Sequence, residues 1–208
     1  MDTDHPENQS PTNYGGYYAW GEMETKSTYN WSTYIHCDGT SGTCHNLGSD
    51  IAGTQYDVAH VKWGGSWQMP SRVQNTELID NCTYEWTTEN GVNGGKFTSK
   101  KNGASIFLLA ASGRTGDNLK YLGSYGYYWS FTKDPDSSHD AYYLIFDLRI
   151  AKSYYGSDRD HGNSVRPVAK LNSPCGSVSN YLIHLILSLQ PTHQVGFSVS
   201  ADMTSGGF

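Results

Sequence analysis

The chain has 208 residues, which fits one domain with extensions better than two separately folded cores. Its formal net charge is −6 and its 14 basic residues are scattered, so it lacks the basic patch that binds nucleic-acid phosphates. Hydrophobic residues make up 37% and charged residues 16%, whereas 23 glycines and 16 tyrosines are typical of a loop-rich extracellular domain. An aromatic content of 13% provides enough burial area to exclude a disordered chain.

Composition divides the chain into three parts. Residues 1–13 are polar and show no periodicity, which predicts a flexible lead-in. Short segments separated by glycines fill residues 14–168, and we predict one domain there. Residues 169–208 form a tail of unknown role, which beyond position 170 has no Lys or Arg; it can be an assembly segment, a linker or read-through sequence. No apolar run approaches the roughly 18 residues of a membrane span, so we expect no direct membrane insertion.

Four cysteines lie at positions 37, 44, 82 and 175, and none belongs to a pattern with zinc-site spacing. Cys37 and Cys44 bracket a Gly/Ser/Thr-rich stretch that can close as a small disulfide loop or remain as two thiols. Cys82 lies beside aromatic residues and is interpreted as a buried thiol.

Two helices are expected in the first half of the chain. Residues 71–81 begin with a Pro-Ser start signal, and Val73, Leu78 and Ile79 then fall near one face. A weaker helical pattern covers residues 56–62.

The second half is predicted to form strands. Residues 104–111, ASIFLLAA, are almost wholly apolar and predict a strand buried on both faces. Residues 127–131 precede a polar turn, KDPDSSHD, and a strand with two distinct faces follows it. Its core face is predicted to comprise Tyr142, Leu144, Phe146, Leu148 and Ile150, and its presented face Tyr143, Ile145, Asp147 and Arg149.

Several motifs occur in a distinctive order: YGGYYAWGE (14–22), YDVAHVKWGGSWQMPS (56–71), NCTYEWT (81–87), NGASIFLLAASGR (102–114), GSYGYYWSF (123–131), AYYLIFDL (141–148) and GNSVRPV (162–168). Together they resemble the Fibrobacter succinogenes major paralogous domain, a bacterial surface and secreted family. This family is similar to the variable proteins of diversity-generating retroelements and to formylglycine-generating enzymes. The resemblance implies an α+β, C-type-lectin-like fold with one or two helices and small antiparallel sheets. Trp20, Trp63, Trp67, Trp86 and Trp129 are then interpreted as core residues.

The resemblance also implies a location outside the cell, at a cell surface or on a virion, and it leaves three functions open. The first is a non-enzymatic binding module for a protein or glycan, with oligomers possible and no cofactor. The second is a formylglycine-type oxidase, which needs a redox-active cysteine pair near the C-terminal end of the fold; this pair is missing from the sequence. The third is a structural surface or virion subunit.

Acidic residues and histidines near the end of the domain do not indicate a catalytic or metal site by sequence alone. His139-Asp140 and the run from Asp158 to His161 place acid and base side by side, but no nucleophile motif accompanies them. Asp134 and Asp136 can supply oxygens to a cation, yet Asp-Pro-Asp is equally a turn. We therefore predict solvated turns, with neither catalysis nor a metal ion.

Eight of the 16 tyrosines lie between residues 121 and 166, among Ser, Asp, Gly, His and Asn. This mixture gives antibody paratopes large contact areas and adaptable hydrogen bonds. Retroelement proteins diversify codons that yield chiefly the same residue types. Strand parity places Tyr143 on the presented face, and the other candidates lie in two glycine-bounded loops, SYGYY and SYYGSDRDHGN. The predicted binding face comprises Tyr125, Tyr127, Tyr143, Tyr154, Tyr155, Ser157, Asp158, Asp160, His161 and Asn163.

Overall fold

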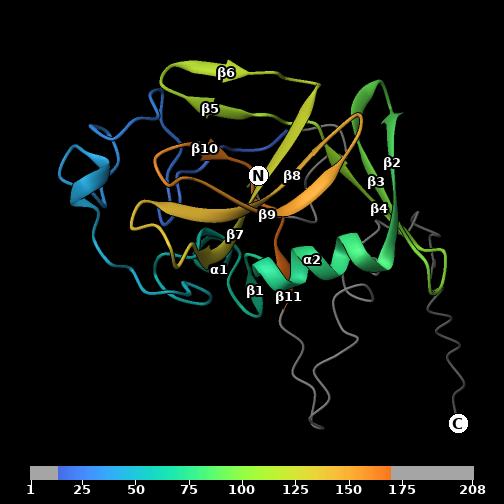
Figure 1. Cartoon of the computed structure of the whole chain (residues 1–208), viewed down its shortest axis with the longest axis horizontal. Helices are drawn as coiled ribbons and strands as arrows, with labels where there is room; N and C mark the ends of the chain where they lie inside the picture. The colour runs from blue at the N-terminus through green and yellow to red at the C-terminus, as the bar shows by residue number, and fades with distance from the viewer. Residues whose placement is uncertain (1–13, 170–208) are drawn as a thin grey trace, which may run out of the picture.

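The computed structural model describes residues 14–169 (Figure 1). Two α-helices and small antiparallel sheets are joined by long loops, which confirms the predicted α+β, loop-rich class. The predicted lead-in, the tail beyond Ala169 and Cys175 lie outside the described residues. The elements follow in this order: η2 (Ser41–Thr43), α1 (Val58–Trp63), β1 (Trp67–Gln68), α2 (Arg72–Asn81), β2 (Cys82–Glu89), β3 (Val92–Ser99), β4 (Ser105–Leu109), β5 (Gly113–Thr115), β6 (Asn118–Lys120), β7 (Tyr125–Lys133), β8 (Asp140–Asp147), β9 (Ala151–Asp158), β10 (Gly162–Asn163) and β11 (Val168–Ala169).

The strands form four small sheets. Three have three strands, in the orders β2-β3-β4, β7-β8-β9 and β10-β5-β6, and β1 pairs with β11. All these pairings are antiparallel. In Figure 1 the blue, mostly loop segment at the start of the described chain lies beside β10 and the β5-β6 hairpin, and α1 lies below β7, while α2 runs beneath β9 toward β2. Because β1 and β11 pair, the last described strand returns to the segment that precedes α2.

Helix α2 begins as the sequence predicts. The Ser71 hydroxyl accepts a hydrogen bond from the Gln74 amide at 2.9 Å, and the Gln74 side chain accepts one from the Ser71 amide at 2.8 Å. This reciprocal cap satisfies amides that the first helical turn leaves unpaired. The buried side of the helix carries Leu78, whereas Val73 is 66% exposed, so the predicted common face of Val73, Leu78 and Ile79 is wrong at Val73. The weaker prediction at 56–62 corresponds to α1, which Asp57 caps.

Strand β8 explains why the predicted core face of 142–150 is only partly right. Tyr142, Leu144 and Phe146 are buried, but Leu148 is 69% exposed and Ile150 is 38% exposed. The strand ends at Asp147, whose carboxylate accepts hydrogen bonds from the amides of residues 149 and 150 at 2.7 and 3.0 Å. A turn of this kind ends the two-residue alternation, so parity cannot be extended past it.

The apolar run at 104–111 yields a shorter strand than predicted. β4 covers Ser105–Leu109, and Ala110 and Ala111 continue it as fully buried loop residues. Phe107 is only half-buried, so one face of the strand is less covered than the sequence predicts.

Large aromatic side chains fill the core. Trp20 and Trp129 are almost completely buried, and their indole N–H groups donate to the carbonyls of Ser130 and Tyr18 at 2.9 and 2.7 Å. These hydrogen bonds remove the cost of burying a polar indole nitrogen. The other three tryptophans predicted to be core residues, at positions 63, 67 and 86, are partly buried.

Cys37 and Cys44 form a disulfide, and Cys82, the free cysteine within residues 14–169, is buried as predicted. The bridge closes the glycine-rich loop that contains η2. Within the described residues, neither helix is long and apolar enough to cross a membrane.

Removing this disulfide should cost about 2 kcal/mol of unfolding free energy, because a cross-link over so short a loop restricts the unfolded chain by about that amount. The comparison is a urea unfolding curve of the protein against one of the Cys37→Ser/Cys44→Ser variant. Wild-type protein treated with dithiothreitol should match the variant, since both lack the bridge. Identical midpoints for oxidised and reduced protein would contradict the expectation.

Candidate functional site

Five of the predicted tyrosines lie together on the β7-β8-β9 sheet. Tyr125 and Tyr127 are on β7, Tyr143 is on β8, and Tyr154 and Tyr155 are on β9; we call this set the tyrosine face. Tyr143 and Tyr155 are register partners, so their side chains leave the same face of the sheet.

The tyrosine rings of this face form two contacting groups, one on β7 and β8 and one on β9. The rings of Tyr125 and Tyr127 are stacked with centroids 5.8 Å apart, and Tyr127 and Tyr143 are also 5.8 Å apart. Tyr154 and Tyr155 are 4.5 Å apart. Contacts at these distances stabilise aromatic pairs beyond the area they bury, so the rings within each group hold one another in place.

Exposure increases along this face toward β9. Tyr125, Tyr127 and Tyr143 are half-buried, and burial raises the pKa of Tyr127 to about 12. Tyr154 and Tyr155 are 53% and 43% exposed. The β9 pair therefore offers most of the surface that a ligand can reach.

Lys152 adds a positive charge to the tyrosine face. Its ammonium nitrogen lies 5.4 Å from the ring centroids of both Tyr154 and Tyr155, and 3.4 Å from the Tyr155 hydroxyl. Hydrogen bonding with Lys152 lowers the pKa of the Tyr154 hydroxyl. Hydrogen bonding with Tyr154 and Tyr155 in turn raises the pKa of the Lys152 ammonium. The exposed part of the face can therefore offer a cation and two phenol groups together.

The remaining predicted site residues lie at the end of β9, in the turn that follows it and in β10. Ser157 and Asp158 end β9, and His161 lies in the turn toward β10, where its Nδ1 is 3.2 Å from the Ser157 hydroxyl. Asp160 and Asn163 are each only 4% exposed, which removes them from a solvent-facing surface. The buried Asn163 backbone pairs with Tyr18 in both directions, at 3.0 and 3.1 Å.

The first predicted glycine-bounded loop lies mostly in strand β7, and the second lies in β9 as far as Asp158, where the turn toward β10 begins. Gly126 lies within β7 and Gly156 within β9. A Cβ atom at Gly156 would meet the Asp134 carboxylate at 2.9 Å and the Asp140 Cβ at 3.1 Å, so the glycine permits close packing rather than a turn. The predicted turn at Asp134 is present, because its carboxylate accepts a hydrogen bond from the Asp136 amide at 3.0 Å.

Sequence reasoning missed two members of this surface. Tyr121 is 64% exposed, and its ring lies 5.5 Å from that of Tyr125. Lys152 stands two residues before Tyr154 in β9. Strand alternation would place both side chains on one face, but the sequence indicates no strand at residues 151–158.

A separate depression of about 520 Å³ lies between residues 21–26 and Tyr56, and none of the ten predicted residues lines it. No protein-family model, curated protein or solved structure matches this chain, so the resemblance carried by its motifs stays a prediction.

Proposed function

We propose that the chain is a non-enzymatic binding module that presents its tyrosine face to an extracellular protein or glycan. The observation that carries the proposal is the gathering of five tyrosines on neighbouring strands, in two groups of contacting rings: Tyr125, Tyr127 and Tyr143 on β7 and β8, and the half-exposed pair Tyr154 and Tyr155 on β9. The two groups are neighbours because Tyr143 and Tyr155 are register partners. Tyrosine gives a large amphipathic contact area and loses little side-chain entropy on binding. Rigid aromatic anchors of this kind supply much of the energy of protein interfaces.

The charge on this face supports a ligand that carries hydrogen-bond acceptors. Lys152 stands between two phenol groups that can donate or accept hydrogen bonds. Aromatic rings beside such donors suit both the apolar face of a sugar ring and a peptide backbone. Protein and glycan ligands therefore remain the two classes in the proposal.

The Cys37–Cys44 disulfide supports a location outside the reducing cytosol, because such bridges persist in oxidising compartments. We place the protein outside the cell, at a cell surface or on a virion. The finer fold in the proposal is the C-type-lectin-like fold, as in the Fibrobacter succinogenes major paralogous domain and the retroelement variable proteins. The ordered motifs between residues 14 and 168 and the α+β architecture support this assignment.

Replacing Tyr154 or Tyr155 with serine should remove about 2 kcal/mol or more of binding free energy, as expected for an interface hot spot. The melting temperature should change little, because both rings are about half exposed. Glycan-array and peptide-display screens of the wild-type protein supply the ligand. Affinity and melting temperature are then measured for each variant.

Ile35→Ser is the matched control, because Ile35 is an exposed apolar residue in the disulfide-bearing loop region, away from this sheet. It should leave affinity unchanged. Ligand affinity that survives both tyrosine substitutions would contradict the proposal. So would a stable homo-oligomer in solution that covers the tyrosine face, since that outcome indicates a structural subunit.

A further inference from the structure

A second group of polar side chains collects where β8 begins and β9 ends. His139 and Asp140 stand at the start of β8, Asp158 ends β9, and Asp160 and His161 follow in the turn. The potential ligand atoms of His139, Asp140 and Asp158 lie within 4.8 Å of one another, as do those of Asp158, Asp160 and His161. Asp158 belongs to both trios and links them.

Asp160 is the unusual member of this group. Its side chain is only 5% exposed, and its Oδ1 atom finds no hydrogen-bond partner within residues 14–169. A buried carboxylate oxygen that lacks a donor is disfavoured unless the carboxyl group is protonated or that oxygen faces a cation. Lys26, whose charge acts on Asp160, donates its hydrogen bonds to Glu22 and to the Thr33 carbonyl instead.

His161 is oriented toward the same point. Its Nδ1 lies 3.2 Å from the Ser157 hydroxyl, which leaves Nε2 facing Asp158 Oδ2 at 3.7 Å and Asp160 Oδ1 at 4.0 Å. Both separations are too long for hydrogen bonds. Metal bonds of about 2.0–2.2 Å place two ligand atoms of a tetrahedral site about 3.4 Å apart, so a small contraction would bring all three atoms onto one ion.

The two carboxylates of the trio stand close together. The potential ligand atoms of Asp158 and Asp160 lie within 4.8 Å of each other. A bound cation would offset the repulsion between them.

The backbone holds these residues in place. Asp140 and Asp158 are register partners, so their side chains leave the same face of the β8-β9 pair. The Arg159 amide donates to the His139 carbonyl at 2.9 Å, and the His161 amide donates to the Asp158 carbonyl at 3.0 Å. A site built on strand ends that are fixed in this way needs little rearrangement to receive an ion.

We propose that Asp158, Asp160 and His161 bind one divalent transition-metal ion of the kind that combines imidazole and carboxylate ligands, such as Zn²⁺ or Mn²⁺. His139 and Asp140 are the neighbouring side chains that can complete the coordination from β8. Ca²⁺ is disfavoured, because it takes about six to eight oxygen ligands and imidazole supplies none. The site stands independently of any ligand on the tyrosine face.

The test uses the full chain after metal removal with a chelator and dialysis. Isothermal titration with Zn²⁺, Mn²⁺ and Ca²⁺ should show one Zn²⁺ or Mn²⁺ per chain at this site and much weaker Ca²⁺ binding. The transition metal should also raise the melting temperature, because it binds only the folded site. Asp160→Asn and His161→Gln should each weaken binding more than about 100-fold, since loss of even an outer-shell partner costs about 10–100-fold.

Asp38→Asn is the matched control. Asp38 and His45 form an exposed pair, 3.3 Å apart, of the same two residue types as the proposed site. Loss of the Asp38 carboxylate should leave metal affinity unchanged. If Asp160→Asn does not fold, His161→Gln decides the outcome, because His161 is 28% exposed. Absence of Zn²⁺ and Mn²⁺ binding, or binding that survives the His161 and Asp160 substitutions, overturns the proposal.

Discussion

Replacing Gly126 with alanine should lower the free energy of unfolding by about 2–3 kcal/mol, the upper range for overfilling a packed core. Gly126 and Phe146 are register partners on β7 and β8, and a Cβ atom at Gly126 would overlap the Phe146 ring. That ring has no exposed surface and packs against Phe97 and Tyr128 with centroids 5.9 Å away in each case. It therefore has no free space into which it can move.

Chemical denaturation of Gly126→Ala and Gly42→Ala tests this expectation. At Gly42, apart from its two chain neighbours, no atom of the described residues lies within 4 Å of the position that a Cβ atom would take. Alanine there should therefore change stability by no more than about 0.5 kcal/mol. Adding Phe146→Leu to Gly126→Ala should recover part of the loss, because leucine leaves room for the new methyl group. Equal stability of the two alanine variants would contradict the close packing of Gly126 and Phe146.

Gly126 also shows where sequence reasoning about this protein fails. A glycine between two tyrosines is typical of a loop, yet here it marks the point at which an aromatic ring from the next strand covers the backbone. Only the register between β7 and β8 reveals this, and register between distant segments is not written in local sequence. The sequence nevertheless places Tyr125 and Tyr127 close together, and both lie in β7 on either side of this glycine.

Local signals are reliable where they depend on neighbouring residues. The Ser71 cap of α2 and the buried positions of β8 through Phe146 follow from contacts within a few residues. Asp160 could not be placed in the same way. Neighbouring Asp and His residues are usually solvated, whereas Asp160 is only 4% exposed in the folded chain.

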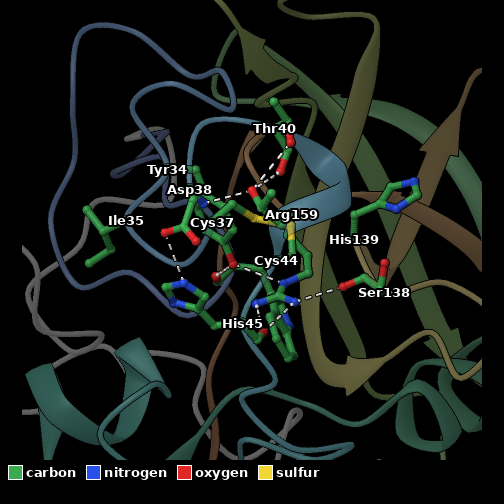
Figure 2. The surroundings of a disulfide bond; sticks show 12 residues. Tyr34, Ile35, Cys37, Asp38, Thr40, Cys44, His45, Ser138, His139 and Arg159 are labelled. Atoms are coloured by element: carbon green, nitrogen blue, oxygen red, sulfur yellow. Dashed lines mark hydrogen bonds and ion pairs between the residues drawn. A yellow bond between two sulfur atoms is a disulfide. The ribbon is translucent and has the colours of Figure 1, made fainter.

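Arg159, the neighbour of Asp160, is fully buried although the sequence suggests a solvated turn. Its side chain joins three segments, which carry Tyr34, His45 and Ser138. Figure 2 shows its guanidinium group beside the disulfide, with hydrogen bonds to the segment of His45 and to the loop before β8. It donates to the Ser138 carbonyl at 3.0 Å, to the His45 carbonyl at 3.2 Å and to the Tyr34 hydroxyl at 3.0 Å. Its charge also lies 4.8 Å from the Trp20 ring.

Replacing Arg159 with methionine should therefore lower the free energy of unfolding by about 3 kcal/mol or more, because the Tyr34 hydroxyl and the carbonyls of His45 and Ser138 lose their shared donor group at once. For a domain of this size the melting temperature should fall by about 6–12 °C. Arg159→Lys should lie between the wild type and methionine, since lysine keeps the charge but not the planar set of donors. Arg149→Met is the matched control at an exposed position and should change stability by no more than about 0.5 kcal/mol. If Arg159→Met unfolds at the same denaturant concentration as Arg149→Met, the hydrogen bonds of this guanidinium do not hold the three segments together.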